Sequence, residues 1–492
     1  MRTSFRRGDP HATSADTLCV GLFDGEGAPT ALEGELKAGL GRLIESGEAR
    51  SAFKKTAILH AEDEGAVQRV VTVGLGKRTD FSPERARIAA AVALGRAADA
   101  AANTLAWLVP ERTEEGRIAT ALVEGSLLAD YRFDRYKSAP QNEDERRRVE
   151  ALELIATDDL EQVVADATLV AESRNAARDL QNLPSNELTP TRLGEHAEQR
   201  ASEIEALEVD VFGPDWIRQQ KMGGLLAVSQ GSDQEPRLIV MRYRGGGESP
   251  LLGLVGKAVT FDTGGISIKP AAKMHEMKFD KSGGAAVIEA TAAIARLGLP
   301  VNLLSVIPAT ENMPSGRAIK PGDIITILNG KTVEVNNTDA EGRLILADGL
   351  SYAVASGAAK LVDLATLTGA IIVALGSTYA GMFSNDDGLA GAIAKIGEET
   401  GEICWRLPLH PDYKDLTRGK VADLVNASEQ RKASSAYAAS FLEEFVDGRP
   451  WVHLDIAGTA WDQDNREYVG KGASGWGVRL LVELARRHAE AS

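Results

Sequence analysis

The sequence predicts an α/β protein: an N-terminal α/β domain is joined by a linker helix to a C-terminal domain whose mostly parallel sheet is covered by helices on both faces. Three observations predict this fold class. The chain has 492 residues, too many for one ordinary core. Short β-branched segments alternate with helical patterns along most of it. Its 49 glycines suit tight turns between strands and helices.

We place the N-terminal domain at residues 1–165. The apolar segments TLCVGLF (17–23) and RVVTVGLG (69–76) are typical of strands, and PERARIAAAVALGRAADAAA (83–102) has helical spacing. Polar residues 136–148 predict a loop, and VEALELIA (149–156) predicts the last strand of this domain. Beyond assembly or regulation, the sequence suggests no role for the domain.

Residues 166–190 are expected to form a linker helix and a proline-containing turn, because Pro184 and Pro190 interrupt the helical pattern of 159–180. Residues 191–492 form the second domain. We expect helices at 285–298 and 344–357. Strands are expected at 236–245, 251–259, 301–309, 331–337, 359–367 and 451–458.

Composition narrows the class of protein. Apolar residues make up 43% and charged residues 26%, which is typical of a globular protein, and the net charge of −16 argues against nucleic-acid binding. Cys19 and Cys404 are expected to be reduced thiols, with a single disulfide as the alternative. The sequence shows no signal-peptide run and no apolar window of membrane-spanning length, which predicts a cytoplasmic protein.

Two charged constellations follow predicted strands. In EVNNTDAEGRLIL (334–346), Asp339, Glu341 and Arg343 alternate with small residues, so on an extended chain they would point to one side. The second, in residues 255–290, contains Lys257, Asp262, Lys269 and Asp280, with a Thr-Gly-Gly turn at 263–265. Parallel sheets place function at the carboxyl ends of their strands, so we expect the two groups to meet.

Four carboxylates in one pocket repel each other unless cations lie between them. Two divalent metals with oxygen ligands, about 3.5–4 Å apart, are a usual arrangement for hydrolysis. A lysine beside two dications can become a neutral ligand, and histidine is not required; the chain has only 7. From spacing alone, the alternative is that these acids are helix caps and structural ion pairs.

The octet NTDAEGRL (337–344) resembles the signature of the leucyl aminopeptidase family, dinuclear metallopeptidases also called cytosol aminopeptidases. The segments VGKAVTFDTGGISIKP, MKFD, LATLTGA and LDIAGTAW also resemble family segments, in family order. The resemblance is dense from about residue 175 to about residue 475.

The resemblance implies roles for particular residues. The metal ligands would be Lys257, Asp262, Asp280, Asp339 and Glu341. Asp262 and Glu341 would be shared between the two ions, and the catalytic pair would be Lys269 and Arg343. The substrate side-chain pocket would include Met277, Thr366, Leu367 (through its carbonyl), Gly369 and Ala457.

The resemblance also implies an activity: removal of the first residue, leucine or another apolar one, from peptides with a free N-terminus. A metal-bridging hydroxide would attack, and Lys269 would stabilise the charge on the carbonyl oxygen. Arg343 stays protonated and cannot be the base. The resemblance implies that it holds a bicarbonate that acts as base. The expected cofactors are two divalent ions per subunit, Mn²⁺ or Zn²⁺ before Mg²⁺ or Co²⁺, and bicarbonate. The expected assembly is a homohexamer.

Two departures from the family pattern stand out. Lys281 follows Asp280 where relatives often carry an apolar or small residue; we expect it to face solvent rather than to weaken the second metal. In the 427–437 loop, residues 432–436 lack the glycines usual in the family, so the shape of this loop differs. The alternative functions are a catalytically silent scaffold or binding protein, and a dinuclear phosphoesterase, which would more naturally use histidines.

Overall fold

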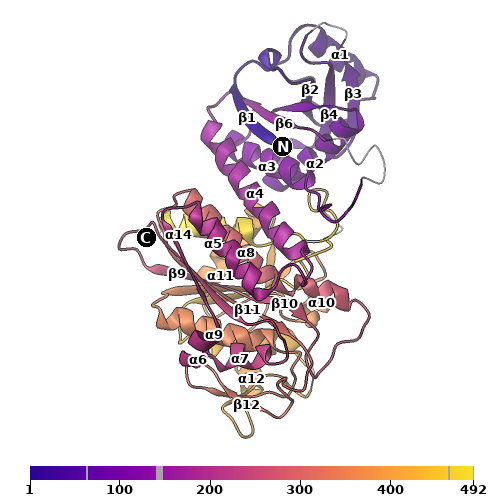
Figure 1. Cartoon of the computed structure of the whole chain (residues 1–492). Coiled ribbons are helices and arrows are strands. Elements are labelled where there is room, and N and C mark those ends of the chain that lie inside the picture. Colours follow the sequence, from indigo (N-terminus) through magenta and orange to yellow (C-terminus); the bar gives the residue numbers. More distant parts are fainter. Residues whose placement is uncertain (62–64, 140–147, 431, 464–465, 491–492) are drawn as a thin grey trace. The chain divides into compact units, whose positions relative to one another are not determined.

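The computed structural model describes residues 1–61, 65–139, 148–430, 432–463 and 466–490. The chain divides into two compact units, residues 1–175 with 464–470 and residues 176–463 with 471–492 (Figure 1). Helix α4 (Glu161–Asn182) crosses this division and ends just before Pro184. Residues 140–147, in the expected polar loop, lie outside the described part of the chain.

The first unit contains a six-stranded sheet, within the described residues, of order β1-β6-β5-β2-β4-β3. Its pairs are parallel except for β3 with β4. The strands are β1 (Arg2–Arg7), β2 (Thr17–Phe23), β3 (Thr56–His60), β4 (Arg69–Gly76), β5 (Thr104–Leu108) and β6 (Ala151–Ala156). The helices are α1 (Gly34–Glu45), α2 (Pro83–Asp99) and α3 (Glu115–Ala129), with the short η1 (Pro10–Ala12) and η2 (Arg78–Asp80).

Two large apolar clusters of the described residues form most of the core of this unit. The larger contains the alanines of α2, the apolar side chains of α3 and residues such as Trp107 of the sheet. The smaller joins Leu40 of α1 to other sheet residues, including Val20. The predicted strands at 17–23 and 69–76 are confirmed, and the predicted helix ends three residues earlier than expected, at Asp99.

The second unit has a larger sheet of order β16-β15-β18-β14-β9-β11-β8-β7, with β10 paired to β11. Its central pairs are parallel, whereas β7, β8 and β15 run antiparallel to neighbours. The strands are β7 (Leu207–Phe212), β8 (Arg237–Arg244), β9 (Leu251–Gly256), β10 (Ala258–Asp262), β11 (Asn302–Asn312), β14 (Lys360–Ala365), β15 (Ala380–Ser384), β16 (Cys404–Arg406) and β18 (Trp451–Asp455).

Helices cover both faces of this sheet: Figure 1 shows α5, α8 and α14 on one side and α6, α7 and α9 on the other. The predicted α/β fold class is therefore confirmed. The helical segments are α5 (Pro190–Ser202), α6 (Pro214–Gln219), α7 (Gly223–Ser229), η4 (Met274–Lys281), α8 (Ser282–Arg296), α9 (Gly342–Ala355), α10 (Gly369–Leu375), α11 (Asp387–Thr400), α12 (Pro411–Asp415), α13 (Ser434–Glu443) and α14 (Val478–Glu490).

Two strand predictions in this unit are wrong in detail. The segment 331–337 contributes only β13 (Thr332–Glu334), which belongs to a separate small sheet with β12 (Ile324–Thr326) and β17 (Leu424–Val425). The segment 251–259 is divided between β9 and β10, with Lys257 at the break. The chain stays paired with β11 in the same register on both sides of the break, as Val255 with Val306 and Ala258 with Ala309, whereas its pairing with β14 ends at Gly256.

Two further expectations can be checked. Cys19 and Cys404 are both free and buried, so the disulfide alternative is wrong. Among the helices of the described residues, none combines the length and the apolar character that crossing a bilayer requires.

Candidate metal centre

The charged residues gather at the carboxyl edge of the central parallel strands. Lys257 follows β9, Thr366 follows β14, and Asp455 is the last residue of β18. Because β9, β14 and β18 are neighbouring parallel strands, the loops after them converge at one edge. Strand β10 adds Asp262 as its last residue.

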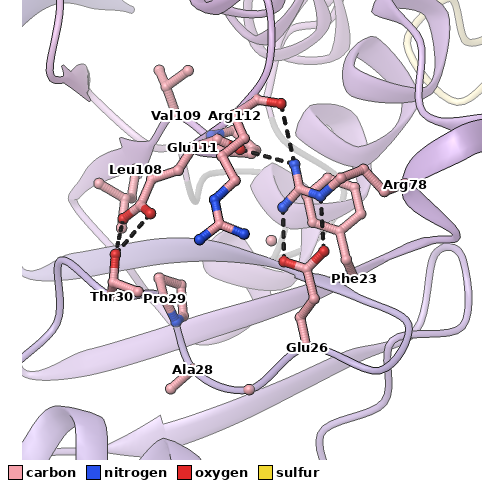
Figure 2. A pocket seen from close by; sticks show the side chains of 13 residues that line it. Phe23, Glu26, Ala28, Pro29, Thr30, Arg78, Leu108, Val109, Glu111 and Arg112 are labelled. Carbon is pink, nitrogen blue, oxygen red and sulfur yellow. Dashed lines mark hydrogen bonds and ion pairs between the residues drawn. The ribbon is translucent and has the colours of Figure 1, made fainter.

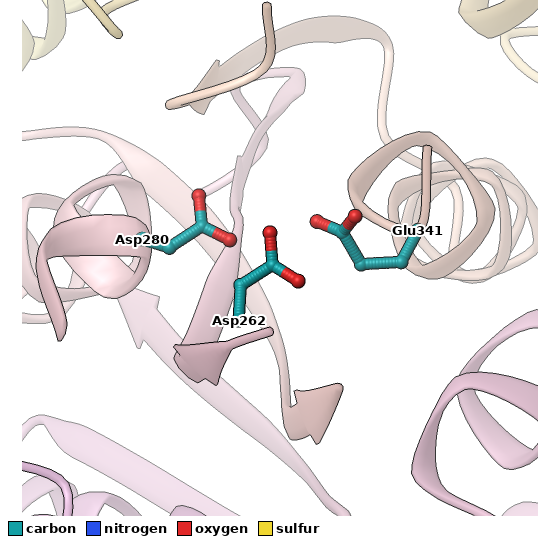
Figure 3. Close-up of side chains that lie close together, drawn as sticks. All are labelled: Asp262, Asp280 and Glu341. Atoms are coloured by element: carbon teal, nitrogen blue, oxygen red, sulfur yellow. The ribbon is translucent and has the colours of Figure 1, made fainter. Parts of the chain in front are cut away.

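Three carboxylates meet at this edge. Asp262, Asp280 and Glu341 are buried, and each offers an oxygen that lies within 4.8 Å of an oxygen of the other two (Figure 3). Asp280 comes from η4, directly before α8. Glu341 is the N-cap residue of α9 and makes no side-chain cap hydrogen bond, which leaves its carboxylate free to point into the cluster.

The expected extended geometry of Asp339, Glu341 and Arg343 is wrong. Glu341 has helical angles (φ −77°, ψ −35°), and Arg343 already lies in α9. Asp339 lies in the loop between β13 and α9. The three side chains are therefore arranged by the start of a helix rather than by a pleated strand.

Two lysines neutralise the carboxylates. The Lys257 Nζ lies 2.8 Å from Asp280 Oδ1 and 2.8 Å from Glu341 Oε1, and it donates to the Thr366 carbonyl at 2.9 Å. A Cβ at Gly342 would lie 2.6 Å from this Nζ, so the close approach of Lys257 requires glycine there.

Lys269 balances the other side of the cluster. Its Nζ lies 2.8 Å from Asp262 Oδ2 and 2.5 Å from Asp339 Oδ1. All four predicted carboxylates therefore contact a lysine ammonium, and the structure brings together every predicted metal-ligand residue.

Burial and charge shift the pKa values within this cluster. Burial raises the pKa of Asp262, and it raises that of Asp280 well above the usual range. Burial and the Glu341 charge raise the pKa of Asp339 to about 6. Burial also opposes ionisation of Glu341, but Lys257 and Lys269 outweigh it, and the pKa of Glu341 is lowered.

The two lysines respond in the opposite sense. Burial favours their neutral amines, but the surrounding carboxylates outweigh it and raise the pKa of both Lys257 and Lys269. Because the carboxylates stabilise both lysines in their protonated form, negative charge dominates the surroundings of these lysines.

The residues of the cluster fit divalent metal ions. In the described part of the chain, Asp280 Oδ2 is buried and has no hydrogen-bond partner, which is costly unless a cation or another donor reaches it. Carboxylate oxygens with amine nitrogens form a donor set that suits hard and borderline dications.

Asn312, which the sequence analysis missed, positions Asp262. Its Nδ2 donates to Asp262 Oδ1 at 2.8 Å and to the Thr338 carbonyl at 3.0 Å. In the pairing of β10 with β11, Asp262 is the direct partner of Asn312. A polar residue at the end of an apolar strand is the signal that could have revealed it. The predicted glycine turn is confirmed, since Gly264 and Gly265 have φ of +85° and +66°.

Arg343 lies beside the cluster and is buried. Its Nη1 donates to the Asn426 carbonyl at 2.7 Å, and its guanidinium lies 5.5 Å from the centre of the Tyr437 ring. Its Nε is buried and has no partner among the described residues, and burial lowers the pKa of Arg343. Arg343 therefore keeps a buried donor that an anion could use.

Part of the predicted substrate pocket lines a cavity of about 280 Å³ next to Asp339 and Arg343. Leu367 and Gly369 line it, together with Thr368 and Tyr437, which the sequence analysis missed. The other three predicted pocket residues are not in this lining: Met277 is half-buried in η4, Thr366 donates to Asp280 Oδ1 at 2.7 Å, and Ala457 is buried.

The expectation that Lys281 faces solvent is wrong. Its side chain is fully buried, and its Nζ donates to the Leu183 carbonyl at 2.7 Å. Burial, with repulsion from Lys278, lowers its pKa to about 7. In the 427–437 loop, Arg431 lies outside the described residues, while Lys432 and Ser434 line the 280 Å³ cavity.

Comparisons with known proteins decide the family. The model of the catalytic domain of the cytosol aminopeptidase family matches residues 175–482, and that of its N-terminal domain matches residues 19–140. This chain belongs to the cytosol aminopeptidase family. The resemblance seen in the sequence is thereby confirmed, and the chain is a metal-dependent aminopeptidase, a hydrolase that acts on peptides.

Relatives cover nearly the whole chain. A probable cytosol aminopeptidase of Roseiflexus castenholzii is 45% identical over 495 residues, covering 99% of each chain. One from Geobacter sp. (strain M21) is 43% identical over 497 residues, covering 99% of this chain and 100% of the relative. Among solved structures, the bottromycin maturation enzyme BotP in complex with Mn is 33% identical with a TM-score of 0.86, covering 96% of this chain and 100% of BotP.

Proposed function

We propose that this aminopeptidase releases the N-terminal residue, leucine or another apolar one, from peptides with a free N-terminus. The observation that carries the proposal is the buried cluster of Asp262, Asp280 and Glu341 with Lys257 between two of its carboxylates. A structural core has no need of so many buried charges, because replacing a buried ion pair with apolar residues is often neutral or stabilising.

Two divalent ions would be held by the Lys257 amine and by four carboxylates, those of Asp262, Asp280, Asp339 and Glu341. We propose Mn²⁺ or Zn²⁺ first, with Mg²⁺ or Co²⁺ as alternatives; the manganese complex of BotP supports manganese. When bound, such ions lower the pKa of a water molecule and polarise a carbonyl oxygen.

Lys269 would stabilise the negative charge that develops on the scissile carbonyl oxygen. Asp262 and Asp339 raise its pKa, so its ammonium stays charged at neutral pH. Its side chain is 21% exposed, whereas that of Lys257 is 3% exposed, so Lys269 is the lysine that a substrate can reach.

Arg343 would hold a bicarbonate that accepts the proton of the attacking water. The guanidinium itself cannot be the base, because it stays protonated. Its buried, unpartnered Nε supports this role, since a bicarbonate oxygen would give that donor the acceptor it lacks.

The apolar preference rests on the family resemblance, since the 280 Å³ cavity has a mixed lining in which Leu367 and Ala370 lie among polar and charged residues. We further propose a cytoplasmic homohexamer, which the family resemblance supports. Sedimentation of the purified chain tests the assembly, since the proposal requires a species six times the 52.3 kDa mass of one chain.

The activity test compares three substrates in the presence of Mn²⁺ or Zn²⁺: Leu-p-nitroanilide, its N-acetylated form and p-nitrophenyl phosphate. We expect release only from the substrate with the free amine. Hydrolysis of the phosphate ester instead would favour the phosphoesterase alternative. Equal cleavage of the acetylated compound would overturn the aminopeptidase scheme.

Two variants locate the site. Glu341→Ala should lose more than about 100-fold in kcat/KM while keeping its circular dichroism spectrum. Glu311→Gln is the matched control, because Glu311 neighbours Asn312 on β11 but bonds instead to Ser232 at 2.6 Å. A similar loss in both variants would contradict the assignment.

A further inference from the structure

The N-terminal unit contains a cavity of about 360 Å³ that is separate from the candidate metal centre (Figure 2). It lies at the carboxyl ends of β2 and β5, which are adjacent parallel strands. Its lining comes from the loop after β2, the loop after β5 and η2. Its volume is at the lower end of the range of small-molecule sites, about 300–1,000 Å³.

The position of this cavity in the sheet is where α/β proteins bind ligands. After β2 the chain continues to β3 and β4 on one side, whereas after β5 it continues to β6 on the opposite side. The two loops therefore diverge and leave a crevice between them. In open sheets of this kind, such a switch point is the usual ligand site.

One side of the cavity is a preorganised wall. Arg78 makes a bidentate pair with Glu26, at 2.8 and 2.7 Å, and its Nη1 donates to the Glu111 carbonyl at 2.8 Å. Its guanidinium also lies 3.9 Å from the centre of the Phe23 ring. This pairing lowers the pKa of Glu26, so both groups stay charged and neutralise each other. Arg78 therefore has little capacity left for a ligand.

The second carboxylate of the lining is also engaged. Both oxygens of Glu111 accept from the Thr30 hydroxyl, at 2.6 and 2.7 Å, which ties the β5 loop to the β2 loop. Glu111 keeps its negative charge, because the Thr30 hydroxyl is neutral, so the two carboxylates and two guanidiniums of the lining balance in charge. With Glu26 paired to Arg78, Arg112 is the guanidinium whose donors remain available to a ligand.

Arg112 extends toward the carboxylate of Glu26, between the Thr30 and Arg78 sides of the cavity (Figure 2). Within the described residues its guanidinium has neither an ion pair nor a hydrogen bond, although its charge is near enough to Glu26 to help lower the pKa of that group. Its backbone adopts φ +58°, uncommon for a residue with a side chain. The apolar residues of the lining, which we call the apolar wall, are Phe23, Pro29, Leu108, Val109 and Pro110.

We propose that this cavity binds a small organic anion, with its phosphate or carboxylate group on Arg112 and its apolar part against the apolar wall. An exposed guanidinium with unused donors recognises such oxyanions, often in a bidentate manner. The volume and the apolar wall select an anion with an organic body over a bare inorganic ion. The site is independent of peptide hydrolysis, and its ligand need not be a peptide.

Calorimetric titration of the full-length chain tests this with four probes: adenosine 5′-monophosphate, 3-phenylpropionate, adenosine and inorganic phosphate. We expect the nucleotide or 3-phenylpropionate to bind at least about tenfold more tightly than adenosine or phosphate, because the latter two carry only half of the recognised features. Tight binding of the nucleotide would indicate an organic phosphate site, and tight binding of 3-phenylpropionate would indicate a carboxylate site.

Three variants tie the binding to this cavity. Arg112→Gln should weaken binding by about 10–100-fold, the value of a charge-assisted hydrogen bond. Gly27→Phe should abolish binding, because a Cβ at Gly27 meets open space beside the cavity and the ring can fill it. Arg96→Gln, an exposed arginine of α2 outside the lining, is the control and should bind normally.

The proposal is overturned if neither organic anion binds, or if Arg112→Gln and Gly27→Phe bind as tightly as the parent chain. Equal affinity for inorganic phosphate and the nucleotide would also overturn it, since this would reveal an adventitious ion only. Hydrolysis of Leu-p-nitroanilide by Arg112→Gln should equal that of the parent chain, so failure here leaves the aminopeptidase assignment unaffected.

Discussion

Replacing Asn426 by alanine tests how far the loop before α9 depends on one buried amide. Its Nδ2 donates to the Asn337 carbonyl at 2.7 Å, and its Oδ1 accepts from the Asn336 N–H at 2.8 Å. Two longer hydrogen bonds, to the Ala340 carbonyl and from the Asn337 N–H, measure 3.4 and 3.3 Å. The Asn426 backbone carbonyl also accepts from Arg343. One residue thus holds the segment that carries Asp339 and Glu341.

The structure sets the expected magnitudes. The two short hydrogen bonds are worth about 1 kcal/mol each, so Asn426→Ala, which removes both, should lose about 2 kcal/mol of unfolding free energy. The functional effect should be larger. A shift of about 1 Å in catalytic groups can cost about 100-fold, so kcat/KM should fall by about that factor.

Urea unfolding and Leu-p-nitroanilide kinetics measure the two effects. Asn302→Ala is the matched control: its amide makes three hydrogen bonds of 2.8–3.1 Å to the 246–249 loop, at the end of β11 away from the metal centre. It should lose similar stability and keep its kcat/KM. The reasoning is refuted if Asn426→Ala stays within about threefold of the parent activity, or if both variants lose activity alike.

Three more predictions concern the same unit. Mn²⁺ at 100 times its Kd should raise the unfolding free energy by about 2.7 kcal/mol per site, seen as a higher melting temperature, and Glu341→Gln should lose most of this gain. Gly342→Ala should lower the free energy of unfolding, measured with urea, by about 1–3 kcal/mol, because its Cβ would lie 2.6 Å from Lys257 Nζ. Gly391→Ala, with open space around it in α11, should instead raise the free energy of unfolding by up to about 1 kcal/mol. Burial raises the pKa of Asp348 to about 7, so the folded state binds more protons between about pH 4 and pH 7 and stability should fall as pH rises through this window. Urea titrations should show a smaller fall for Asp348→Asn, because the raised pKa values of Asp262, Asp280 and Asp339 still contribute to it.

The sequence predicted the membership of the charged cluster better than its geometry. Lys257 and Asp262 lie at the ends of apolar segments, and the carboxyl ends of parallel strands meet at one edge, so their proximity was predictable. The orientation of Asp339 and Glu341 was not, because alternating residues are compatible with a strand and with the start of a helix.

The supporting residues required the tertiary structure. Asn426 bonds to a loop about 90 residues away, and the register of β17 beside β13 sets that contact. The burial of Lys281 likewise depends on a carbonyl after α4, which no local pattern indicates. Both cases are long-range contacts, and single-sequence periodicity carries no information about them.

The small sheet of β12, β13 and β17 likewise could not be predicted from local sequence patterns. KTVEVNN has the β-branched alternation of a strand in the large sheet, yet its partners are β12 and β17. Residue preferences describe a half-buried pleated surface and do not say which sheet provides it. By contrast, β2 and β4 were predicted with their correct bounds, since each is a buried apolar run whose burial needs no particular partner.

The most direct test is anomalous diffraction from crystals of this chain grown with Mn²⁺. Two peaks about 3.5–4 Å apart are expected, bounded by Asp262, Asp280 and Glu341, with Lys269 no longer spanning Asp262 and Asp339. Crystals that show no anomalous signal there, with both lysines still paired to the carboxylates, would contradict the metal centre and the peptidase mechanism built on it.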